Sequence, residues 1–246
     1  PGLTDRGNIK SESLAAIAGG TTSFMDMPNV LPPTLTNDLW RQKIEIASKN
    51  ASANYSFYMG SSNENIEEIR SINALEVCGV KVFMGASTGN LLVDNEESLN
   101  LIFRDSPVPI ATHCEDTPMI KEAEEKFIAK FGEEIPMEAH AEIRSREACL
   151  KSSKKAVDLA NKHNQNLHIL HISTEDELAL FSTKPIEEKL ITAEVCIPHL
   201  YFNSDDYQSK GSLIKCNPSI KSPSDQLALK QALKSGLIDF VATDHA

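Results

Sequence analysis

Short apolar runs alternate with amphipathic helical segments along almost the whole of this chain of 246 residues. The apolar runs are rich in β-branched and aromatic residues, which is typical of buried strands. They lie at residues 21–27, 53–59, 79–84, 107–113, 166–172, 190–197 and 237–244. Helical spacing of apolar residues occurs at 8–18, 37–50, 63–77, 95–104, 141–163 and 224–235. This alternation predicts repeated βα units and a parallel sheet.

The number of predicted strands favours a TIM-type (β/α)8 barrel, because seven strands are one short of the eight that close it. The chain begins with a predicted helix and ends on a strand. We therefore expect the first strand to precede Pro1, the end of the barrel to be missing, and residues 1–246 to form a single incomplete domain. A doubly wound open sheet is the competing fold, but no glycine-rich phosphate loop follows any strand.

The net charge of the chain indicates which class of ligand it binds. The chain has 24 basic and 35 acidic residues for a net charge of −11, which argues against nucleic acid or an anionic membrane as a partner. A small molecule is the expected ligand. Five cysteines without a CxxC pair, no apolar run near the roughly 18 residues of a membrane span, and no signal-peptide pattern predict a cytoplasmic protein.

Chemistry-bearing residues occur at or near the ends of four predicted strands. Strand 79–84 carries Lys81, strand 107–113 ends in His113, strand 166–172 carries His171, and strand 237–244 ends in Asp244. In a barrel the carboxyl ends of all strands meet at one face, so we expect these side chains to converge. Neutral imidazole is a common ligand for zinc, and two histidines with an aspartate favour a metal site over structural roles.

Lys81 allows two interpretations. It alternates with Val80 and Val82 and is therefore expected to point to the opposite face of the strand, into the barrel. An uncompensated ammonium is costly there. The lysine either pairs with a neighbouring acid or is carbamylated, in which case its terminal carboxylate would bridge two metal ions.

The motifs of the chain resemble those of dihydroorotases, in the same order and over essentially the whole length. They are PGLT at 1–4, AGGTTSFMDMPN at 18–29, VKVFMGAS at 80–87, ATHCED at 111–116, LHILHIST at 167–174, EVCIPHL at 194–200, KCNPSIK at 215–221 and ATDHA at 242–246. The MPN at residues 27–29 is especially specific.

The resemblance implies a metal-dependent hydrolysis of the cyclic amide of dihydroorotate, or the reverse cyclisation of N-carbamoyl-L-aspartate, in pyrimidine biosynthesis. It implies that Lys81 is carbamylated and bridges two divalent ions, with zinc as the expected metal. His113 and His171 would bind one ion, while Asp244 would ligate the other and act as general base and then general acid. The family resemblance also implies a homodimer.

The resemblance further implies that Asn29 holds the substrate carboxylate, that Asn217 faces the ring, and that Thr88 belongs to a loop that closes over the substrate. Without the resemblance, Asn29 and Asn217 are equally well interpreted as turn residues beside proline. The family pattern has a His-x-His motif upstream and a further histidine a few residues beyond Asp244, and both are absent from the sequence, so we expect this stretch alone to be inactive.

Other activities remain open at this point. Allantoinase, dihydropyrimidinase or another cyclic amidohydrolase would share the metal strands, although MPN together with KCNP favours dihydroorotase. A non-catalytic amidohydrolase-like scaffold is the alternative from a different class of protein.

Overall fold

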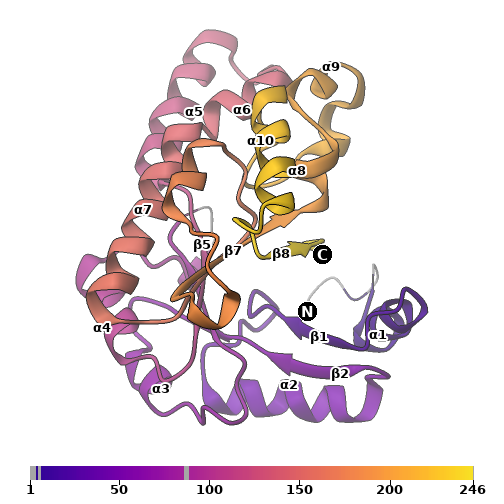
Figure 1. Ribbon diagram of the computed structural model, residues 1–246, viewed down its shortest axis with the longest axis vertical. Coiled ribbons are helices and arrows are strands. Elements are labelled where there is room, and N and C mark those ends of the chain that lie inside the picture. Colours follow the sequence, from indigo (N-terminus) through magenta and orange to yellow (C-terminus); the bar gives the residue numbers. More distant parts are fainter. Residues whose placement is uncertain (1–3, 5–6, 86–88, 246) are drawn as a thin grey trace. The chain divides into compact units, whose positions relative to one another are not determined.

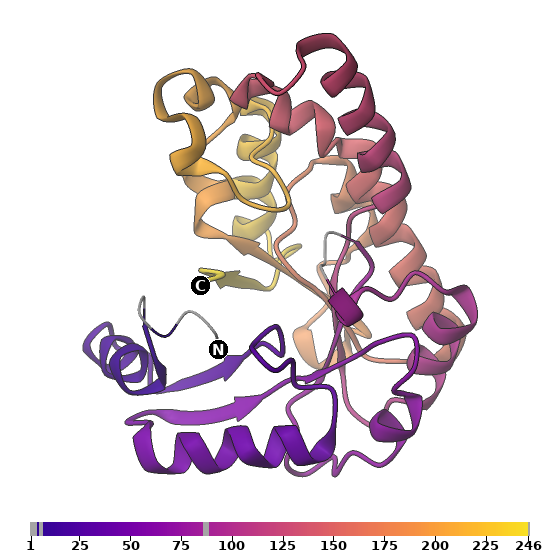
Figure 2. The same cartoon turned by 180° about the vertical axis from the view of Figure 1, so that it is seen from behind.

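The computed structural model describes residue 4, residues 7–85 and residues 89–245. It is an α/β structure, and the strand pairs with a described register are parallel. The chain divides into two compact units, Pro1–Phe83 with Ser87–Ala111, and Met84–Ala86 with Thr112–Ala246. Figures 1 and 2 show the elements of each unit from opposite sides.

Parallel strands and covering helices build the first unit. β1 (Ser23–Asp26) pairs with β2 (Asn54–Phe57), and β3 (Met59–Gly60) pairs with β4 (Val80–Phe83). The helices are α1 (Ile9–Ala18), α2 (Asn37–Asn50), α3 (Ile66–Arg70) and α4 (Glu96–Asp105). In Figure 1, α2 runs along the β1–β2 pair, and Trp40 on α2 donates its indole N–H to the carbonyl of Phe57 at 2.9 Å.

The second unit contains the parallel strands β6 (Leu167–Ile169), β7 (Ile191–Cys196) and β8 (Phe240–Ala242), in that order. Its helices are α5 (Thr117–Phe131), α6 (His140–Ile143), α7 (Arg146–His163), α8 (Ile197–Tyr201), α9 (Tyr207–Lys210) and α10 (Pro223–Lys234). β5 (Ile110–His113) crosses the boundary between the units, and its Thr112 carbonyl accepts a hydrogen bond from the backbone N–H of Leu170 in the second unit.

Strand side chains supply much of each core. In the first unit Val80 and Val82 are fully buried and Lys81 between them is 3% exposed, so β4 is covered on both faces, as parallel strands usually are. In the second unit Ile169 and Val195 are fully buried. Among the helices of the described residues, none combines the length and apolarity that a membrane span needs.

Each of the seven predicted strands is present, although the run at 53–59 forms β2 and β3 with Tyr58 between them. The predicted helix at 63–77 is wrong over most of its length, because α3 ends at Arg70. Asn73 explains part of the difference, since its side chain accepts from the N–H of Leu75 and its carbonyl from Glu76, which replaces helix bonds with a local turn. The predicted helix at 141–163 breaks at Arg144, and Ser145 caps α7.

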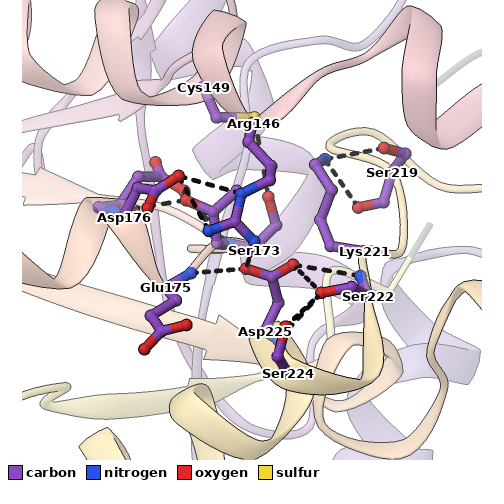
Figure 3. A network of polar contacts seen from close by, with 12 residues as sticks. Arg146, Cys149, Ser173, Glu175, Asp176, Ser219, Lys221, Ser222, Ser224 and Asp225 are labelled. Atoms are coloured by element: carbon purple, nitrogen blue, oxygen red, sulfur yellow. Dashed lines mark hydrogen bonds and ion pairs between the residues drawn. The ribbon is translucent and has the colours of Figure 1, made fainter.

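A polar network joins the starts of α7 and α10 to the 3-10 turn at Asp176–Leu180 (Figure 3). Arg146 on α7 forms ion pairs with Asp225 on α10 and with Asp176. Asp225 also accepts the backbone N–H of Glu175 at 2.8 Å and completes the capping box with Ser222. Asp225 is 1% exposed, so its carboxylate depends on these donors to replace water.

Replacing Asp225 by alanine is expected to lower the free energy of unfolding by about 1–3 kcal/mol, because Arg146 and the N–H of Glu175 lose a buried acceptor and the capping box of α10 loses its N3 carboxylate. Chemical denaturation measures this loss. The matched control is Glu45→Gln, which removes an exposed pair with Lys49 and should leave the unfolding transition unchanged. Equal midpoints for Asp225→Ala and the unchanged protein would contradict the assigned role.

Candidate active site

The second unit brings two of the predicted site residues into contact. Nδ1 of His113, at the end of β5, lies 3.1 Å from Nε2 of His171, which follows β6. Their ring centroids are 4.7 Å apart and the planes are nearly perpendicular at 71°. Both side chains are buried, with exposed fractions of 5% and 4%. Parallel pairing explains the contact, because it places the ends of neighbouring strands at the same edge.

Backbone strain marks two of the predicted residues. Among the described non-glycine residues, positive φ occurs at Asn164, His171 and Asp244. Asn164 caps the end of α7, where a left-handed residue is ordinary. His171 with φ of 40° and Asp244 with φ of 50° have no such explanation, and this conformation costs about 1–3 kcal/mol at residues other than glycine. Strain of this kind concentrates at functional sites.

Glu115 is a site residue that the sequence analysis missed. Its Oε2 accepts a hydrogen bond from Nε2 of His113 at 2.8 Å and another from Nη1 of Arg144. Burial acts to raise the pKa of Glu115, but the hydrogen bond from His113 and the positive charges of Arg144 and Lys221 outweigh burial and hold the pKa below its usual value. The spacing His-x-Glu was the available signal, because residues i and i+2 of an extended segment share a face.

The histidine pair fits two positions of a metal site. Two nitrogen ligands of a tetrahedral zinc ion, each bonded at 2.0–2.1 Å, lie about 3.3 Å from each other. The observed 3.1 Å between Nδ1 of His113 and Nε2 of His171 is close to that separation. A group of three or more His, Cys, Asp or Glu side chains able to hold a metal ion does not occur among the described residues.

Lys81 lies in the first unit, while both histidines lie in the second. Its Nζ is 4.5 Å from the centroid of the Phe83 ring, and its carbonyl accepts hydrogen bonds from the backbone N–H and the hydroxyl of Ser61. The side chain is 3% exposed, in agreement with the burial that strand alternation predicts. A cation–π contact compensates the buried ammonium in part.

The predicted substrate residues occupy turns at the surface of their units. Asn29 is exposed and follows β1 in the first unit. Lys43 on α2 fixes the backbone that leads into this turn. Its Nζ donates to the carbonyl of Met27 at 2.7 Å and pairs with Asp26 at 2.8 Å. Thr88, the predicted loop residue, lies outside the described residues.

Asn217 in the second unit is exposed. The backbone carbonyls of its two neighbours, Cys216 and Pro218, each accept a hydrogen bond from a buried histidine. Nε2 of His140 donates to the carbonyl of Cys216 at 2.9 Å, and Nε2 of His199 donates to the carbonyl of Pro218 at 3.0 Å. Burial lowers the pKa of both histidines, for His199 from 6.5 to about 4. The two rings therefore stay neutral near pH 7 and restrict the segment that presents Asn217.

The stability of the protein is expected to fall as the pH drops from about 6.5 to about 4, partly because of His199. In this interval the unfolded chain binds a proton at His199 and the folded chain does not, so protonation favours unfolding by up to about 3 kcal/mol. Urea titrations at several pH values measure this slope. His199→Gln should show a flatter dependence, and identical slopes for both proteins would disprove the assignment.

No protein-family model matches the chain. A dihydroorotase from Methanosarcina mazei is 29% identical over 256 residues, and an allantoinase from Bacillus velezensis is 28% identical over 251 residues. Each match covers 100% of this chain and 55% of the relative. The chain therefore spans about half the length of the curated relatives it matches.

Solved structures agree with these relatives. The L-hydantoinase (dihydropyrimidinase) from Arthrobacter aurescens has a TM-score of 0.89 and 25% sequence identity, and the match covers 97% of this chain and 53% of that one. The comparisons support a cyclic amidohydrolase family. Dihydroorotase, allantoinase and hydantoinase names occur together among the similar proteins, so the class of reaction is better supported than the particular substrate.

Proposed function

We propose that this chain belongs to a dihydroorotase, which hydrolyses the cyclic amide of dihydroorotate and, in reverse, cyclises N-carbamoyl-L-aspartate in de novo pyrimidine biosynthesis. The observation that carries the proposal is the buried pair of His113 and His171, whose nitrogens have the separation of two zinc ligands. The likeness to dihydroorotases over the whole chain supports the choice of substrate, together with the MPN and KCNP motifs.

The proposed site holds two divalent cations, with zinc as the metal. His113 and His171 would hold one cation, Asp244 would hold the other, and a carbamylated Lys81 would be a ligand of both. Bound cations lower the pKa of a coordinated water toward neutrality and polarise the amide carbonyl. The imidazole pair suits this role because neutral ring nitrogens are common ligands of zinc.

Asp244 is the proposed proton carrier. It takes the proton from the attacking water and delivers it to the ring nitrogen that leaves. Its positive φ supports this role, because strain is tolerated where a side chain must be aimed. Asn29 holds the substrate carboxylate, Asn217 faces the ring, and Thr88 belongs to the loop that closes over the substrate.

The proposal also covers the fold of the domain, the class of ligand, the cellular compartment and the oligomeric state. Residues 1–246 belong to one (β/α)8 barrel domain of the TIM type. The partner is a small molecule, in keeping with the net charge of −11, and the protein acts in the cytoplasm as a homodimer.

A second candidate substrate class is supported by a specific observation. The allantoinase is 28% identical to this chain against 29% for the dihydroorotase, and the hydantoinase structure superposes with a TM-score of 0.89. Allantoin or a dihydropyrimidine would use the same metal ligands. These substrates lack the ring carboxylate that Asn29 is proposed to hold, so substrate tests separate the candidates.

The test is metal content together with hydrolysis of dihydroorotate, allantoin and dihydrouracil by the full-length parent protein and its Lys81→Ala variant. We expect about two metal ions per chain, preference for dihydroorotate, and an activity loss of more than about 100-fold in the variant, because the bridging ligand is gone.

Lys189→Ala is the matched control, because Lys189 is also buried and pairs with Asp239 at 2.6 Å. It should lose stability but keep its metal. Full activity in Lys81→Ala would remove the bridging role, preference for another cyclic amide would reassign the substrate, and the absence of both metal and turnover would indicate a non-catalytic scaffold.

A further inference from the structure

The hydrogen bond between His113 and Glu115 determines which imidazole nitrogen carries a proton. An ionised carboxylate can only accept, so Nε2 of His113 is the donor in this 2.8 Å contact. In the neutral ring, Nδ1 is then the unprotonated nitrogen, which can act as an acceptor or a metal ligand. That nitrogen is the one that faces Nε2 of His171 at 3.1 Å.

Glu115 is itself held in one orientation. Its side chain is completely buried, and Arg144 donates to the same Oε2 atom that accepts from His113. The ammonium of Lys221 adds a further positive charge that acts on the carboxylate. Because both donors converge on Oε2, the position of this one atom defines the direction of the His113 ring.

The donors to Glu115 gather on one oxygen of its carboxylate. Oε1 is buried without a hydrogen-bond partner among the described residues. Arginine–carboxylate pairs are frequently bidentate, with a donor on each oxygen. Here Arg144 reinforces only the oxygen that orients His113, and it leaves the other oxygen without a donor.

We propose that Glu115, clamped by Arg144, is a positioning residue that keeps His113 in the Nε2–H tautomer and presents its Nδ1 to a divalent cation. Metal-ligating histidines generally donate their second ring N–H to a carboxylate or carbonyl, which fixes the ring and makes the ligand more basic. The inference rests on the proposed function, because the cation is part of that proposal.

The first test measures zinc affinity by competition with a chromophoric chelator. Glu115→Ala should bind zinc about 100-fold more weakly than the unchanged protein, and Glu115→Gln about ten-fold more weakly, since a carboxamide oxygen still accepts from Nε2–H but carries no charge. Glu177→Gln is the matched control, because Glu177 is a buried carboxylate that accepts hydrogen bonds from the hydroxyls of Ser153 and Thr174. It should keep the original affinity.

The second test reads the tautomer directly in the metal-free protein. Long-range proton–nitrogen spectra of protein with labelled histidine, recorded at about pH 8, should place the proton of His113 on Nε2. Glu115→Ala should show a mixture of both tautomers or the Nδ1–H form. Glu115→Leu, which also removes the acceptor, provides the same reading if the alanine variant does not fold.

The outcomes separate this inference from the function on which it rests. Zinc binding that stays within two-fold of the original in both Glu115→Ala and Glu115→Gln, or an unchanged His113 tautomer in the variant that lacks the acceptor, overturns the positioning role and leaves the metal site intact. A protein that binds no divalent cation overturns both proposals.

Discussion

Parallel pairing of short strands is the constraint from which the candidate site follows. In the second unit β6, β7 and β8 run in the same direction, so their carboxyl ends lie along one edge. The end of β5 joins them through the hydrogen bond from Leu170 to the carbonyl of Thr112. His113 and His171 can meet only because neighbouring strands end together there, although 58 residues separate them in sequence.

Buried charged side chains determine the conformation of several loops in the two units. A carboxylate or ammonium that leaves water must find donors or acceptors, and each partner then fixes a piece of backbone. Glu115 pairs with Arg144, which directly follows α6, and Asp225 pairs with Arg146 at the start of α7. In the first unit Lys43 holds the carbonyl of Met27, which precedes the turn that carries Asn29. These buried polar contacts therefore fix the conformation of loops that contribute few side chains to the apolar core.

The similar proteins share a type of chemistry more than a substrate. Dihydroorotase and allantoinase relatives are nearly equal in identity, at 29% and 28%. Fold alone does not define a substrate, so residues around the site have to make that choice. Asn29 and Asn217, which lie on turns held by buried side chains, are the residues proposed to contact the substrate.

The periodicity of the sequence alone determined the order of the strands, and it placed Lys81, His113, His171 and Asp244 at or near their ends. Period-two alternation also predicted the burial of Lys81. The sequence did not reveal the short α3, because the turn at Asn73 competes with a helix that the apolar spacing allows. It also did not reveal that Arg144, 29 residues away, clamps Glu115 against His113. Such contacts depend on how distant segments pack, and local pattern carries no information about that packing.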